Sequence, residues 1–79
     1  MPNAFNLPNV PSKDFIKVIE QLGFYFDRQK GSHAIYKNAE GKRVVIPIHS
    51  GKDIKQGTLS GMLQDIDLDK ETFFKLLQK

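Results

Sequence analysis

The stretch FYFDRQKGSHAIYKNAEGKRVVIPIH, residues 24–49, decides the fold of this 79-residue chain. From residue 24 the apolar side chains repeat with a period of two, which is typical of a β-strand, and residues 33–38 and 43–48 predict two further strands. Short glycine-containing turns separate the three segments, at residues 30–32 and 39–41. The stretch therefore predicts a three-stranded antiparallel meander, in which Pro47 moves the far end of the last strand to an edge or a bulge.

The loop between the second and third strands sets the strand register. Residues 39–41 fit a three-residue hairpin loop, with Gly41 at the position that requires a left-handed backbone. Such a loop pairs Asn38 with Lys42. One face of the sheet then points to the core with Tyr36 across from Val44, Ala34 across from Ile46, and Phe24 and Phe26 beside them.

The opposite face carries the histidines. His33 lies across from Pro47, and His49 follows one step further along the third strand, so their Cβ atoms are expected roughly 7–8 Å apart as diagonal neighbours. The same face holds Lys37 across from Arg43, Ile35 across from Val45, and Tyr25. A four-residue loop would reverse the two faces and bury His33.

Apolar residues at helical spacing flank the meander on both sides. Before it, Ser12 is the expected N-cap of a helix and Gly23 its expected end. After it, Thr58 is the expected N-cap of a second helix, and Asp67 or Asp69 caps a short third helix. The apolar residues of these two helices are Leu59, Met62, Leu63 and Ile66, then Phe73, Phe74, Leu76 and Leu77. The order α-β-β-β-α-α predicts an α+β fold with the helices packed on one face of the sheet and the other face free.

Composition restricts the class of protein. The length allows one domain, and we expect residues 1–11, with three prolines, to form an extended N-terminal arm before a single domain of residues 12–79. The absence of cysteine excludes disulfides, thiolate nucleophiles and zinc knuckles. The chain has neither an apolar run of about 18 residues nor a secretory signal, which predicts a cytoplasmic protein without a membrane partner.

The net charge of +3 is concentrated in and around the meander. Residues 28–55 contain seven basic side chains and two acidic ones, whereas acidic residues slightly outnumber basic ones on either side. The basic residues are Arg28, Lys30, Lys37, Lys42, Arg43, Lys52 and Lys55. This distribution is typical of a surface that faces phosphates, and a solvated hairpin is the alternative interpretation.

A set of short motifs resembles one protein family. The motifs are Gly31-Ser32-His33, Tyr36, Gly41, Pro47-Ile48-His49, Gly51-Lys52, Ile54-Lys55, Gly57-Thr58-Leu59 and Phe73, preceded by Leu7-Pro8 and Leu22-Gly23-Phe24. Over nearly the whole chain they resemble the HicA family, the toxins of HicA–HicB toxin–antitoxin modules. The resemblance implies a double-stranded-RNA-binding-like fold, α-β-β-β-α with a further helix, and a ribonuclease acting on mRNA. It also implies a HicB-type antitoxin partner and a catalytic histidine at His33. Members often carry a second histidine or another larger residue after the triplet, where this chain has Ala34.

RNA cleavage suits a chain with few reactive side chains, because the 2′-hydroxyl of RNA is itself the nucleophile. The enzyme has to remove that proton, stabilise the charge on the phosphorane and protonate the leaving 5′-oxygen. We expect His33 to act as general acid or base, since histidine titrates near neutral pH. His49 is expected as a second acid or base, a phosphate ligand or a loop residue. No metal and no other cofactor is implied, because no two carboxylates stand near the histidines at ligand-like spacing.

Six further residues are expected to contact RNA, and they are Lys30, Ser32, Lys37, Arg43, Lys52 and Lys55. Ser32 has an alternative interpretation as a turn residue, and Tyr25 either stacks on a base or joins a patch that an antitoxin covers. Three functions remain open at this point. They are a metal-independent endoribonuclease, a non-catalytic RNA-binding module of the same fold, and an adaptor that binds protein and no RNA.

Overall fold

The computed structural model describes residues 9–48 and 53–78. The elements are β1 (Val10–Pro11), α1 (Ser12–Gln21), β2 (Tyr25–Lys30), β3 (His33–Lys37), β4 (Arg43–Pro47), β5 (Asp53–Ile54), α2 (Gln56–Asp65) and α3 (Lys70–Leu77). The strands β2, β3 and β4 form one antiparallel sheet in that order, and β1 pairs with β5 in a separate two-stranded sheet. The predicted α+β order, the meander and the double-stranded-RNA-binding-like arrangement are confirmed.

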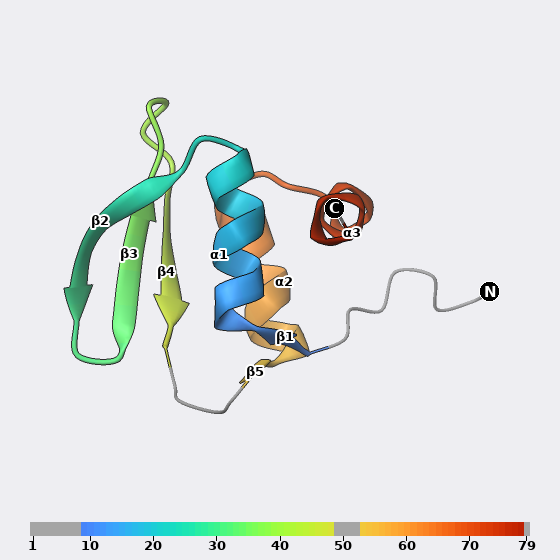
Figure 1. Cartoon of the computed structure of the whole chain (residues 1–79), viewed down its shortest axis with the longest axis horizontal. Coiled ribbons are helices and arrows are strands. Elements are labelled where there is room, and N and C mark those ends of the chain that lie inside the picture. Colours follow the sequence, from blue (N-terminus) through green and yellow to red (C-terminus); the bar gives the residue numbers. More distant parts are fainter. Residues whose placement is uncertain (1–8, 49–52, 79) are drawn as a thin grey trace.

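The helices lie on one side of the three-stranded sheet, with α3 beyond α1 and α2 (Figure 1). The core between these layers is formed by side chains that lose all solvent exposure, among them Phe15 of α1, Ile46 of β4, Leu59 of α2 and Phe73 of α3. The rings of Phe15 and Phe73 have centroids 5.8 Å apart, which joins α1 to α3. The apolar residues predicted for the last two helices are all buried or packed against this core.

The sheet has the register that the loop predicts. The Asn38 N–H donates to the Lys42 carbonyl at 3.1 Å, and Gly41 has a φ of +88°. The observed partners between β3 and β4 are those expected, namely Tyr36 with Val44, Ala34 with Ile46, Ile35 with Val45, Lys37 with Arg43, and His33 with Pro47. Because Ala34 belongs to the core, its replacement of a larger residue occurs on the helix side of the sheet, away from His33.

The bounds of α1 differ from the prediction at one end only. Gly23 ends the helix as expected, with a φ of +93° and an N–H that donates to the Glu20 carbonyl. Ser12, however, is the first helical residue and not the N-cap, because Pro11 is extended as part of β1 and takes the cap position. The Ser12 hydroxyl donates instead to the Pro47 carbonyl at 2.6 Å, and this bond ties α1 to β4.

The two-stranded sheet of β1 and β5 was not predicted. Val10 pairs with Ile54, and its side chain is 2% exposed within the core. The expected arm of residues 1–11 thus contributes Val10 to the core of the domain, which the sequence did not indicate. The partner strand is distant in sequence, so no local pattern indicates the pairing. Residues 1–8 of the expected arm lie outside the described residues.

The second strand differs from the prediction because it contains a bulge. The register of β2 shifts between Phe26 and Arg28, which leaves Asp27 without a partner on β3. Phe26 is 52% exposed, so its predicted place in the core is wrong, whereas Phe24 is buried as expected. The core cluster takes its residues of this sheet from β3 and β4, and the ring of Phe26 packs beside that cluster against Tyr36.

The caps of the last two helices were predicted with mixed success. The helix α2 begins at Gln56 with Lys55 as N-cap, so the prediction of Thr58 is wrong; the extended backbone of β5 leads directly into the helix. Asp69 caps α3 as expected, because its carboxylate accepts the Thr72 N–H at 3.0 Å and the Thr72 hydroxyl at 2.7 Å. These bonds lower the pKa of Asp69.

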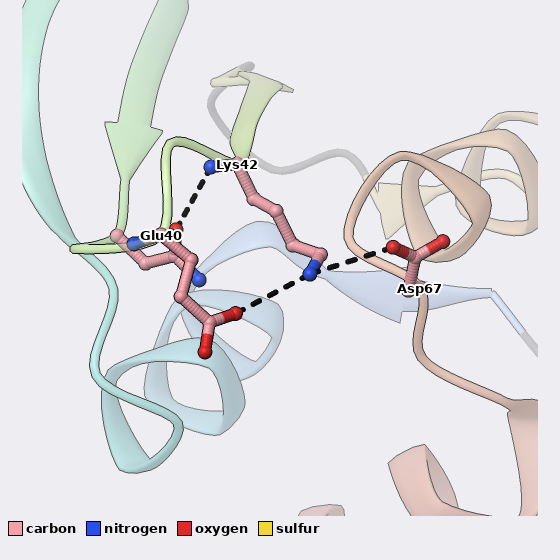
Figure 2. A network of polar contacts seen from close by, with 4 residues as sticks. Glu40, Lys42 and Asp67 are labelled. Atoms are coloured by element: carbon pink, nitrogen blue, oxygen red, sulfur yellow. Dashed lines mark hydrogen bonds and ion pairs between the residues drawn. The ribbon is translucent and has the colours of Figure 1, made fainter.

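The hairpin loop is joined to the turn between α2 and α3 through Lys42 (Figure 2). The Lys42 ammonium lies 3.3 Å from Glu40 Oε1 and 3.5 Å from Asp67 Oδ2. Hydrogen bonding to Glu40, and then to Asp67, raises the pKa of Lys42. This cation is therefore part of a structural network, and it is not counted below among those available to a ligand.

Candidate nucleic-acid interface

His33 is the first residue of β3 and is exposed. It pairs with Lys30 of β2 on one side and with Pro47 of β4 on the other, so backbone on both sides holds its position. The expectation that the imidazole lies across from Pro47 and outside the core is confirmed. The backbone of His33 is held on both sides, and its imidazole is accessible to solvent. A general acid or base requires both properties.

The turn before His33 is held by hydrogen bonds on both of its residues. Gly31 has a φ of +56°, as the first central residue of a type II′ hairpin turn requires. The Gln29 Nε2 donates to the Gly31 carbonyl at 3.0 Å, and the Ile48 N–H donates to the Ser32 carbonyl at 2.6 Å. The turn is thereby tied to both neighbouring strands, which limits the motion of His33 relative to the sheet.

We call the sheet face that points away from the helices the outer face. The observed register aligns its side chains in three cross-strand rows, which are Lys30–His33–Pro47, Arg28–Ile35–Val45 and Tyr25–Lys37–Arg43. Ile35 is only 5% exposed, yet it does not belong to the core cluster. Its neighbours on the outer face therefore cover it, and the face has an apolar centre with cations around it.

Asp27 moderates the positive charge of the outer face. Its Oδ2 lies 3.4 Å from the Lys37 ammonium and 3.7 Å from the Arg28 guanidinium. Among the residues that the structure describes, Lys30 and Arg43 take part in no ion pair. The outer face thus holds four cations, two of them shared with one carboxylate and two with their charge uncompensated.

The chain matches the model of a family described as the HicA toxin of bacterial toxin–antitoxin systems, over residues 12–68. This chain belongs to the HicA family. The match extends from α1 through the turn after α2, and so includes the whole meander and His33. Membership makes it the toxin of a toxin–antitoxin module, and a toxin of this kind has an antitoxin partner. No curated protein matches the chain.

The HicA meander contains four of the predicted site residues besides His33. Lys30 and Ser32 lie within three residues of it, and Lys37 and Arg43 share its face at the other end of the sheet. Lys55 is exposed but lies at the N-cap of α2, outside the sheet. His49 and Lys52 fall outside the described residues, so the proposed pairing of the two imidazoles stays a prediction.

Arg28 is a further residue of this HicA surface, and its place there was not predicted from the sequence. Strict alternation from Phe24 puts Arg28 on the helix side of the sheet, whereas the bulge at Asp27 moves it to the outer face, across from Ile35. The local sign of such a bulge is Asp27 itself, a polar residue in the middle of a short strand, and that sign is weak.

Within residues 9–48 and 53–78, no three histidine, aspartate or glutamate side chains come together as a metal-binding group. In the same part of the chain, no helix has the length and apolar character to cross a membrane.

Proposed function

We propose that this chain is a metal-independent endoribonuclease that cleaves mRNA, with His33 as general acid or base. One observation supports the proposal above all. The exposed imidazole of His33 follows a turn that is held by hydrogen bonds, at the end of a cationic sheet face free of helices. RNA is a polyanion, and cations along a surface attract it and orient its backbone. The imidazole is therefore next to the position that a phosphate would take.

In the proposed reaction the 2′-hydroxyl oxygen attacks the adjacent phosphorus, and the bond from phosphorus to the 5′-oxygen breaks. His33 either accepts the proton of the 2′-hydroxyl or donates one to the leaving 5′-oxygen. Lys30, its cross-strand neighbour, stabilises the negative charge that develops on the phosphorane oxygens. The products are a 2′,3′-cyclic phosphate, or the 3′-phosphate after hydrolysis, and a 5′-hydroxyl. Acid–base help from one imidazole typically accelerates such a step by about 10²–10⁴-fold.

The proposed partner of the toxin is a HicB-type antitoxin that covers the outer face. Such a partner blocks the reaction simply by occupying the surface that the RNA backbone needs. Because the outer face is basic, the part of the antitoxin that lies on it is expected to be acidic.

The second candidate is a non-catalytic RNA-binding module. The observation in its favour is the double-stranded-RNA-binding-like order of elements together with the cationic face. This function needs the same cations but no imidazole, so the two candidates differ in the effect of removing His33.

The experiment is digestion of a defined RNA in EDTA, followed by analysis of the product ends. We expect cleavage by the wild type and a loss of about 10²-fold or more in His33→Ala. Lys30→Ala should also cleave more slowly, whereas its matched control Lys75→Ala, which removes an exposed cation from α3, should cleave as the wild type does. Equal cleavage by His33→Ala and the wild type would overturn the role of His33. Salt-dependent RNA binding without new ends would favour the binding module.

A further inference from the structure

The end of the outer face opposite His33 has a composition of its own. There Tyr25 of β2 pairs with Lys37 of β3, which pairs in turn with Arg43 of β4. Tyr25 is 54% exposed, so its ring is accessible to a ligand. An exposed aromatic ring in one row with two cations is the combination with which proteins hold unpaired bases and the phosphates next to them.

The neighbouring residue Phe26 is exposed to a similar degree but lies on the other face of the sheet. Phe26 is 52% exposed, yet its ring packs edge-on against the buried Tyr36, with centroids 5.8 Å apart and an interplanar angle of 75°. Phe26 therefore lies on the helix side. Because successive side chains of a strand alternate, Tyr25 points to the outer face, and no aromatic partner of its own is found among the described residues.

The row of Tyr25, Lys37 and Arg43 lies at the other end of the sheet from His33. His33 and Lys37 are four residues apart on one strand, which corresponds to about 14 Å at 3.4 Å per residue. Between them the centre of the face is apolar, with Ile35 buried and Val45 38% exposed, and Arg28 lies beside Ile35 on β2. An RNA strand lying along the sheet would therefore meet an imidazole at one end and an aromatic ring with two cations at the other.

Asp27 gives Lys37 a defined place in this row. The carboxylate is itself only 25% exposed, and its Oδ2 lies 3.4 Å from the Lys37 ammonium. A lysine side chain has several rotatable bonds, so this ion pair restricts where the ammonium group lies. Arg43 is not restrained by a carboxylate among the described residues, and it carries an uncompensated charge at the opposite edge of the sheet.

We propose that Tyr25, Lys37 and Arg43 form a second RNA subsite, in which Tyr25 stacks on an unpaired base while Lys37 and Arg43 hold the adjacent phosphates. The inference rests on the proposed function and specifies its substrate. In a duplex both faces of each base are covered by neighbouring bases, so a stacking tyrosine selects single-stranded RNA. The subsite binds substrate remote from the scissile phosphate and leaves the chemistry to His33.

The test measures binding of a fluorescent single-stranded RNA and of its duplex in a His33→Ala background, where cleavage is suppressed. We expect Tyr25→Ala to bind the single strand about 5- to 150-fold more weakly, the range for loss of one stacked base. Tyr25→Phe keeps the ring and should stay within about twofold. Phe26→Ala is the matched control, because it removes an equally exposed ring from the other face, and its affinity should be unchanged.

In the active enzyme the same substitution should raise KM for single-stranded RNA and leave kcat unchanged, since the subsite does not touch the reacting atoms. Failure of the wild type to bind or cleave any RNA would refute the proposed function itself. The subsite alone would be refuted if Tyr25→Ala and Phe26→Ala bound the single strand with equal affinity. It would also be refuted if the protein bound the duplex as tightly as the single strand. Loss of antitoxin binding with unchanged RNA affinity in Tyr25→Ala would make the row a protein interface, and would also overturn the inference.

Discussion

The charge of the outer face predicts how steeply RNA affinity falls with salt. For single strands, the logarithm of the binding constant changes with the logarithm of salt concentration by about −0.7 for each phosphate neutralised. Four cations, Arg28, Lys30, Lys37 and Arg43, set an upper limit of about −2.8 for this face. Asp27 carries one negative charge, so full compensation of one cation would make the slope about −2.1.

These limits correspond to measurable losses of affinity. Between 50 and 200 mM salt, a slope of −2.8 weakens binding roughly 50-fold, and a slope of −2.1 weakens it roughly 18-fold. We expect the wild type to fall between these values. Arg43→Gln should reduce the magnitude of the slope by about 0.7, and Asp27→Asn should move it toward the upper limit, because the carboxylate no longer competes with phosphate.

The assay is fluorescence anisotropy with a single-stranded RNA at several potassium chloride concentrations, in the His33→Ala background. Lys75→Gln is the control, since it changes the net charge by the same amount on α3, away from the sheet (Figure 1). An equal loss of slope in Lys75→Gln and Arg43→Gln would show that net charge alone matters. A slope unchanged by both Arg43→Gln and Asp27→Asn would show that RNA does not lie on this face.

Three further predictions concern the framework of the site. A Cβ atom added by Gly31→Ala meets no neighbouring atom within 4 Å, but the residue keeps a positive φ. The substitution should therefore destabilise the fold by about 1–2 kcal/mol and lower the Tm. An unchanged Tm would contradict this account of the turn. Val10→Ala removes a buried side chain of β1 and should cost about 1.5–3 kcal/mol in urea denaturation, whereas the exposed Val45→Ala should cost clearly less; equal costs would place Val10 outside the core. Hydrogen bonds from Thr72 lower the pKa of Asp69, so the stabilisation it gives is present above its unfolded pKa near 3.8 and is lost as the pH falls through the lower folded value. The gap in Tm between wild type and Asp69→Ala should therefore close in acid, and a gap that persists below both pKa values would refute the cap.

Features of the fold that depend on local geometry could be predicted from the sequence. The hairpin loop ending at Gly41 determines the partner of every residue on β3, and with it the face on which His33 lies. Gly23 and Asp69 likewise act on the backbone next to them. The pairing of β1 with β5 could not be predicted, because it joins two dipeptides more than forty residues apart, with no repeating pattern in either.

The predicted site had a different limit, which was the assumption of regular alternation. Lys30, three residues before His33 in the sequence, was expected to contact RNA. Regular alternation from Phe24 would instead turn both Lys30 and Arg28 toward the helices, where the burial of a charge is costly. The residue inserted at Asp27 restores both cations to the outer face and leaves its own carboxylate between Arg28 and Lys37. One bulge thus places Lys30 beside the imidazole and puts the carboxylate of Asp27 beside Lys37, where it lowers the net charge of the outer face. The proposed cleavage site and the proposed stacking subsite therefore depend on the same irregularity in β2.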